Sequence, residues 1–189
     1  NYRRVIKYSQ QNGLSSFFDY LTWQVSRLRE GDKITGIKAS VDQAEMLFQS
    51  NAIPGYFDKV HWVMVQRDDT LAQAISFSIA AQTRRWTSND SPPSADPVYN
   101  FEDIQRRVEM LCDEQAQINV FCAMRGIAPI RVTYEEFTAN PKGSALSIAD
   151  QMGIEGPSFD ETIVTLRPQS DGRNEEFRAR FIEDYAARS

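Results

Sequence analysis

Apolar residues in the range Val60–Val65 predict a strand, and the residues after it predict a turn and a long helix. The run VHWVMV is interrupted only by His61, which is typical of a strand covered on both faces in a parallel sheet. Asp68 or Asp69 supplies a helix N-cap, and the helix is predicted to continue to Arg85. This order puts polar side chains at the carboxyl end of a strand, where open α/β sheets bind ligands.

The remaining chain alternates between helical and strand periodicity, which predicts a parallel α/β fold. Asn100 is predicted to cap a helix, and Thr133 with Glu136 forms a capping box at the start of another. The proline-containing segment 88–100 is either a lid or a plain connector. The predicted elements are helices at 14–29, 41–49, 100–124 and 143–152, strands at 34–38 and 129–132, and an irregular segment at 159–173.

Arg67 and Ser76 are candidates for an anion site. Arg67 lies just past the end of the predicted strand, and a guanidinium there can meet a phosphate with several donors. From Asp69 the offsets of four and seven residues put Gln73 and Ser76 on roughly one helix face, where a Ser hydroxyl would add a second donor. The alternatives are that Arg67 is an ordinary surface ion-pair partner and that Ser76 bonds to its own backbone.

Length and composition indicate one globular domain, 1–189, with a sizeable core. The 189 residues are 41% hydrophobic and 25% charged, and the net charge of −5 argues against a nucleic-acid-coating protein. Cys112 and Cys122 are ten residues apart on one predicted helix, about 15 Å, so they cannot form a disulfide within it. With no metal-ligand cluster and no long apolar run, we expect a cytoplasmic protein without a metal or a transmembrane segment.

Three segments resemble bacterial sulfotransferases of the trehalose 2-sulfotransferase type. RDDTLAQAISFSIAAQTRRWTS resembles the family segment Arg-Asp…Gln-Ala-x-Ser…Ala-x-Gln-Thr-x-x-Trp. TYEEFTANPKGSALSIADQMGI is similar to a Tyr-Glu-Glu/Asp-Leu…Asn-Pro segment, and QSDGRNEEFRARF to a Gln-x-Asp…Asn-x-Glu-Trp ending. The resemblance implies a P-loop nucleotide-binding, sulfotransferase-like α/β architecture. It also implies sulfuryl transfer from 3′-phosphoadenosine 5′-phosphosulfate (PAPS) to a hydroxyl of a carbohydrate or glycolipid.

The resemblance assigns roles in binding PAPS or its product adenosine 3′,5′-bisphosphate (PAP). Arg67 and Ser76 match the pair that holds the 3′-phosphate, although nine positions separate them here and many sulfotransferases have eight. Tyr134 would lie near the adenine, or would be a wall residue at a strand end. Lys38 ends the segment ITGIK, where a Lys would face the bridging oxygens of the leaving group. In the same comparison Arg167 and Arg173 match a C-terminal loop that reaches the 3′-phosphate.

The acceptor side is predicted from three residues. Trp86 would stack on a sugar ring or cover the end of its helix, because aromatic faces suit the apolar faces of sugars. Gln73 and Thr83 would bind sugar hydroxyls or lie solvated on the helix surface. The resemblance also implies a homodimer.

The sequence departs from the family at its start. No Gly-rich loop of the kind that cradles the 5′-phosphosulfate follows a first strand, so the fold is expected to lack that strand and loop. Either residues precede Asn1, or the chain is a degenerate relative that binds nucleotide or a protein partner without transferring sulfate. We predict no catalytic role for His61, which stands about 20 Å along the strand from the phosphate end. Asp42, Glu45 and Asp90 are candidate bases, and none is singled out.

Overall fold

The computed structural model describes residues 2–16, 19–20, 22–24, 34, 36–50, 52–55, 57, 59–87, 90, 96–163 and 172–188. The chain divides into two compact units, Asn1–Val60 and His61–Ser189, and each is described by itself. No helix among these residues is long and apolar enough to cross a membrane. The mixture of helices with a small parallel sheet agrees with the predicted α/β class.

The first unit contains α1 (Tyr2–Gln11), α3 (Val41–Gln49) and α4 (Ala52–Gly55). The prediction for α3 is confirmed, and Ser40 begins it with a reciprocal capping box to Gln43. Of the helix predicted at 14–29, residues 19–20 and 22–24 are helical, and 25–29 lie outside the described part. The predicted start is wrong, because residues 14–16 are not helical.

The strand predicted at 34–38 is wrong for the residues described there. Residues 34 and 36–38 have no regular structure, and both Ile34 and Ile37 are exposed. A strand needs a hydrogen-bonded neighbour, and the sheet in the described part of the chain consists of two strands from the second unit.

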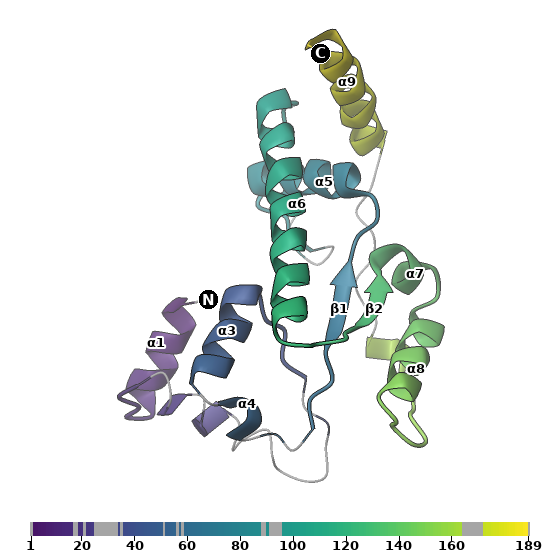
Figure 1. The fold of residues 1–189 in the computed structure, drawn as a ribbon. Helices are drawn as coiled ribbons and strands as arrows, with labels where there is room; N and C mark the ends of the chain where they lie inside the picture. The colour runs from purple at the N-terminus through teal and green to yellow at the C-terminus, as the bar shows by residue number, and fades with distance from the viewer. Residues whose placement is uncertain are drawn as a thin grey trace. The chain divides into compact units, whose positions relative to one another are not determined.

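Two parallel strands organise the second unit. In Figure 1 the arrows of β1 (Val63–Gln66) and β2 (Ile130–Thr133) point the same way, with Gln66 opposite Thr133 at their carboxyl ends. The prediction that the first strand is covered on both of its faces is incorrect, because Met64 is buried but Val65 is 67% exposed. Successive strand side chains point to opposite faces. On the face of Val65 the paired residue of β2, Val132, is buried, whereas Val65 itself is not covered by the described residues.

The crossover between the strands is helical. It consists of α5 (Thr70–Thr83) and α6 (Phe101–Met124), and β2 leads into α7 (Tyr134–Ala139) and α8 (Pro141–Gln151). The predicted caps are confirmed at three of these starts, where the backbone amide three residues on donates to Asp69, Asn100 or Thr133. Helix α8 begins two residues before its prediction, because Asn140 caps it and a proline occupies its first position.

The core joins α5 and α6 to the last helix, α9 (Gly172–Arg188), which follows the short 3-10 helix η1 (Glu161–Ile163). Phe101 of α6 and Phe181 of α9 stack with their ring centroids 4.9 Å apart. Tyr99 adds an edge-to-face contact with Phe177, and its hydroxyl donates a hydrogen bond to Asp184 at 2.8 Å. The buried members of this core are Ala74, Ile75, Phe101, Ile104, Phe177 and Phe181.

A polar network also fastens α5 to α6. The buried Ser78 hydroxyl donates to Asp103 Oδ2 at 2.7 Å, and Arg107 Nε pairs with the same oxygen at 2.7 Å. Burial raises the pKa of Asp103, but the hydrogen bonds from Arg107 and Ser78 outweigh that effect and hold it below the ordinary range. The ionised carboxylate therefore stabilises the fold.

We expect Asp103→Asn to lower the free energy of unfolding at pH 7 by about 1–2 kcal/mol. Because the folded-state pKa is depressed, this stabilisation is present above the unfolded pKa of about 3.9 and is lost as the pH falls through the folded value. Urea denaturation between pH 7 and pH 3 should show the gap between wild type and variant closing below about pH 4. A constant gap, or an equal effect of Asp113→Asn at the exposed face of α6, would contradict this assignment.

Candidate functional site

Two helix N-termini meet at the carboxyl end of the small sheet. Parallel pairing in register puts Gln66 and Thr133 side by side, and α5 and α7 begin within four residues of these two positions. The backbone amides of a first helical turn carry partial positive charge. The structure thus builds the edge at which α/β proteins bind anions, as the order of elements in the sequence predicts.

Arg67 is the central side chain at this edge. Its guanidinium lies 4.7 Å above the Tyr134 ring and its Nε lies 3.6 Å from Glu135 Oε1. The side chain is 23% exposed, and Nε is buried without a hydrogen-bond partner. Arg67 is therefore an ion-pair partner, as the ordinary alternative predicted, but its donors are not all satisfied by the protein.

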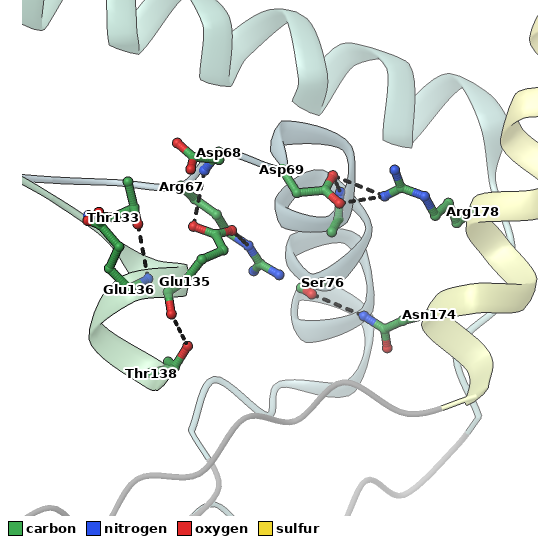
Figure 2. Close-up of polar contacts among 11 residues, drawn as sticks. Arg67, Asp68, Asp69, Ser76, Thr133, Glu135, Glu136, Thr138, Asn174 and Arg178 are labelled. Carbon is green, nitrogen blue, oxygen red and sulfur yellow. Dashed lines mark hydrogen bonds and ion pairs between the residues drawn. The ribbon is translucent and has the colours of Figure 1, made fainter. Parts of the chain in front are cut away.

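Glu135 ties the turn after β1 to the start of α7. Besides facing Arg67, it accepts a hydrogen bond from the backbone N–H of Asp68 at 3.2 Å (Figure 2). Desolvation raises the pKa of Glu135, but hydrogen bonds from backbone amides and the charge of Arg67 bring it below its usual range. Glu135 is thus an anchor of the turn, whereas Glu136 completes the capping box with Thr133.

Helix α9 supplies two further side chains to this region. Asn174 Nδ2 donates to Ser76 Oγ at 3.1 Å, so Ser76 has a partner outside its own helix. Arg178 Nη1 donates to both oxygens of Asp69, at 3.0 Å and 2.8 Å. Figure 2 shows both pairs between α5 and α9, with the Arg67 guanidinium extending in the direction of Ser76.

Asp69 is held as a carboxylate by these neighbours. Burial raises its pKa, but the Ala72 amide, Arg178 and the charge of Arg67 together lower it below the ordinary value. Neither Asn174 nor Arg178 was predicted as a site residue from the sequence. The available signal was their spacing of four residues within the third family-like segment, which puts them on one face of a helix.

The other residues predicted to bind the nucleotide are distributed more widely. Tyr134 begins α7 beside Arg67. This position is compatible with both predicted roles, a contact with the adenine ring and a wall residue at the strand end. Arg173, at the start of α9, pairs with Asp96 at 2.9 Å. Arg167 lies outside the described residues, and Lys38 is exposed in the first unit, so their roles stay predictions from the resemblance.

The three predicted acceptor residues lie along α5 and just beyond it. Gln73 is half-buried in the first half of α5, and Thr83 is ten residues on, about 15 Å along the axis. The Thr83 hydroxyl donates to the Ile79 carbonyl at 2.8 Å. Trp86 is 57% exposed and packs edge-to-face on Phe77 at 5.5 Å. The structure therefore places the Trp86 ring against Phe77, which lies between Gln73 and Thr83 on α5.

No base stands out among the candidates. Asp90 accepts hydrogen bonds from the Trp86 and Thr87 amides at 2.7 Å and 2.6 Å, and these keep its pKa below the ordinary range. This arrangement is a loop cap and does not favour proton uptake. Asp42 and Glu45 belong to α3 in the first unit. Within the described ranges, no group of three or more His, Cys, Asp or Glu side chains is arranged to hold a metal.

Comparison with known proteins gives the family. The model of the Stf0 sulphotransferase family matches residues 40–184, which include both strands and most of α9. The chain belongs to this family of transferases, and the resemblance found in the sequence is confirmed. It is also similar to a trehalose 2-sulfotransferase of Mycobacterium tuberculosis, with 30% identity over 93 residues, or 49% of this chain. The matched part is 35% of the relative's length.

Proposed function

We propose that this chain binds PAPS and takes part in transferring its sulfuryl group to a hydroxyl of a carbohydrate or glycolipid. The observation that carries the proposal is the buried Nε of Arg67 at the carboxyl end of the sheet, in a chain of the Stf0 family. This Nε has no hydrogen-bond partner, although it lies 3.6 Å from Glu135 Oε1 in an ion pair. A buried donor without an acceptor costs free energy, and a bound phosphate would offset that cost. The donor set at this edge suits an anion.

The proposed roles follow from the side chains at that edge. Arg67 and Ser76 would hold the 3′-phosphate with a charged and a neutral donor, and Tyr134 would lie against the adenine. Glu135 keeps the turn that carries Arg67 in place through the Asp68 amide. When bound, PAPS supplies the sulfuryl group and departs as PAP. Donors fixed in advance stabilise charge that develops on a leaving phosphate.

The proposal for the acceptor rests on Trp86 and on the similarity to a trehalose 2-sulfotransferase. The exposed Trp86 ring is fixed on its other side by Phe77, which is itself covered by the Arg107 guanidinium at 4.4 Å. A ring held in this way offers a rigid apolar platform, which suits the C–H face of a sugar. No base is assigned.

The proposal is tested by incubating the full chain with PAPS labelled in its sulfuryl group and with trehalose, other saccharides or a non-sugar alcohol. We expect label to move to a saccharide, and Trp86→Ala to weaken saccharide use by roughly 5- to 10-fold, the value of one stacking contact. The control is Tyr185→Ala, because Tyr185 is an exposed aromatic residue on α9. Phe177→Ala would be unsuitable, because that ring is in the core. Binding of PAP without label transfer would favour the non-catalytic alternative, and absence of both would overturn the proposal.

A further inference from the structure

Helix α9 contacts the proposed phosphate site through two polar side chains on one of its faces. Asn174 and Arg178 are four residues apart, and so share that face. Their partners Asp69 and Ser76 are seven residues apart at the cap and in the second turn of α5. The contacts join residues about one hundred positions apart in the chain (Figure 2).

The direction of the Asn174 hydrogen bond determines what the Ser76 hydroxyl does next. A hydroxyl has one O–H donor and two acceptor lone pairs. Because Asn174 Nδ2 donates to Ser76 Oγ, one lone pair is occupied and the Ser76 proton is left to point at another acceptor. A hydroxyl that accepts one hydrogen bond also donates a stronger one. This arrangement makes Ser76 a donor, which is what a phosphate requires.

Arg178 changes the charge of the same region. Asp69 caps α5 through its carboxylate, which is close enough to Arg67 for the guanidinium charge to affect it. Unpaired, that carboxylate would repel a phosphate bound at Arg67. Arg178 contacts both carboxylate oxygens and cancels their charge without displacing the cap.

We infer that α9 contributes two residues to the phosphate site. Asn174 orients the Ser76 hydroxyl as a donor, and Arg178 neutralises the carboxylate of Asp69. Both are positioning residues, since each acts through another side chain. The inference rests on the proposed function, because it assigns these side chains to the binding of the 3′-phosphate of PAP or PAPS.

The test is calorimetric binding of PAP to the full chain and to variants of α9. Asn174→Ala should weaken binding by about 3- to 10-fold, the value of one hydrogen bond. Asn174→Asp should weaken it further, because a carboxylate would accept the hydrogen bond that the Ser76 hydroxyl donates and would add negative charge. Arg178→Ala should also weaken binding by about 5-fold or more. Adding Asp69→Asn to Arg178→Ala should restore it to within about 2-fold of wild type, since Asn caps helices as well as Asp does.

The matched control is Arg188→Ala. Arg188 also joins α9 to a neighbour, through an ion pair with Glu102 at 2.8 Å and a contact over the Phe101 ring, but it lies at the far end of the helix. We expect this variant to bind PAP within about 2-fold of wild type. Equal losses in Arg188→Ala and Asn174→Ala would mean that only the docking of α9 matters, which would overturn the inference.

Failures of the two proposals are distinguishable. If wild type binds PAP and Arg67→Ala does not, but the Asn174 and Arg178 variants bind like wild type, then only the inference about α9 is overturned. If Asp69→Asn fails to rescue Arg178→Ala, the charge-neutralising role of Arg178 is overturned. If wild type does not bind PAP, the proposed function is overturned and the inference with it.

Discussion

Replacing Arg67 by Ala is expected to weaken PAP binding by about 10- to 150-fold. This range corresponds to the roughly 1.5–3 kcal/mol of a charge-assisted hydrogen bond to a phosphate. The side chain is three-quarters covered, and its Nε is buried without a hydrogen-bond partner, so a bound phosphate gains a donor that is already desolvated. Calorimetry on wild type and variant measures the loss directly.

The matched control for this prediction is Arg106→Ala. Arg106 pairs with Asp103 on α6, and its side chain is 72% exposed. An exposed ion pair contributes little, so PAP affinity should stay within about 2-fold of wild type. Equal losses from both substitutions would indicate general attraction between arginines and a charged ligand, and Arg67 would then have no special place in binding. Raising the salt concentration should weaken the binding of PAP to both proteins only modestly, because a short-range contact with a partly buried side chain is screened little by salt.

Phe181→Ala is expected to lower the free energy of unfolding by about 3–5 kcal/mol. Phe181 is buried at the junction of α9 with α6, where its ring stacks on Phe101 at 4.9 Å. Removing the ring leaves a cavity among residues of three helices and loses the stacking contact. Since single domains are stable by only about 5–15 kcal/mol, this change is a large fraction of the total.

The control for Phe181 is its neighbour Ile182 on α9, which is 53% exposed. Ile182→Ala should cost less than about 1 kcal/mol, because it creates no cavity. Urea denaturation followed by circular dichroism gives both values. A cost for Phe181→Ala as small as that for Ile182→Ala would mean that α9 does not pack on α5 and α6. Asn174 and Arg178 would then have no fixed place near Ser76 and Asp69.

The sequence predicts the helix starts well because their signals are local. Asp69, Asn100 and Thr133 each accept a hydrogen bond from an amide three residues on, and such a pattern is visible in any stretch of sequence. The strands are predicted less well because pairing is a non-local condition. The segment 34–38 has strand-like composition, but its described residues have no neighbouring strand and no regular structure.

In the candidate site, too, the features that depend on adjacent residues were predictable and those that depend on long-range packing were not. Arg67 was found because it follows a strand, which is a property of adjacent residues. Its ion pair with Glu135 depends on the parallel register of β1 and β2, which the sequence does not specify. The contacts of Asn174 and Arg178 depend on the packing of α9 against α5. Phe177 and Phe181 hold α9 in place by packing in a core with residues of α5 and α6 that are far away in the sequence.

The central claim is that the edge formed by β1, α5, α7 and α9 binds the 3′-phosphate of PAPS. The most direct test is to compare, by calorimetry on the full chain, the affinities for PAP and for adenosine 5′-monophosphate, which lacks only the 3′-phosphate. We predict that PAP binds at least about 10-fold more tightly and that Arg67→Ala removes most of this difference. Equal affinity of wild type for the two nucleotides would contradict the account.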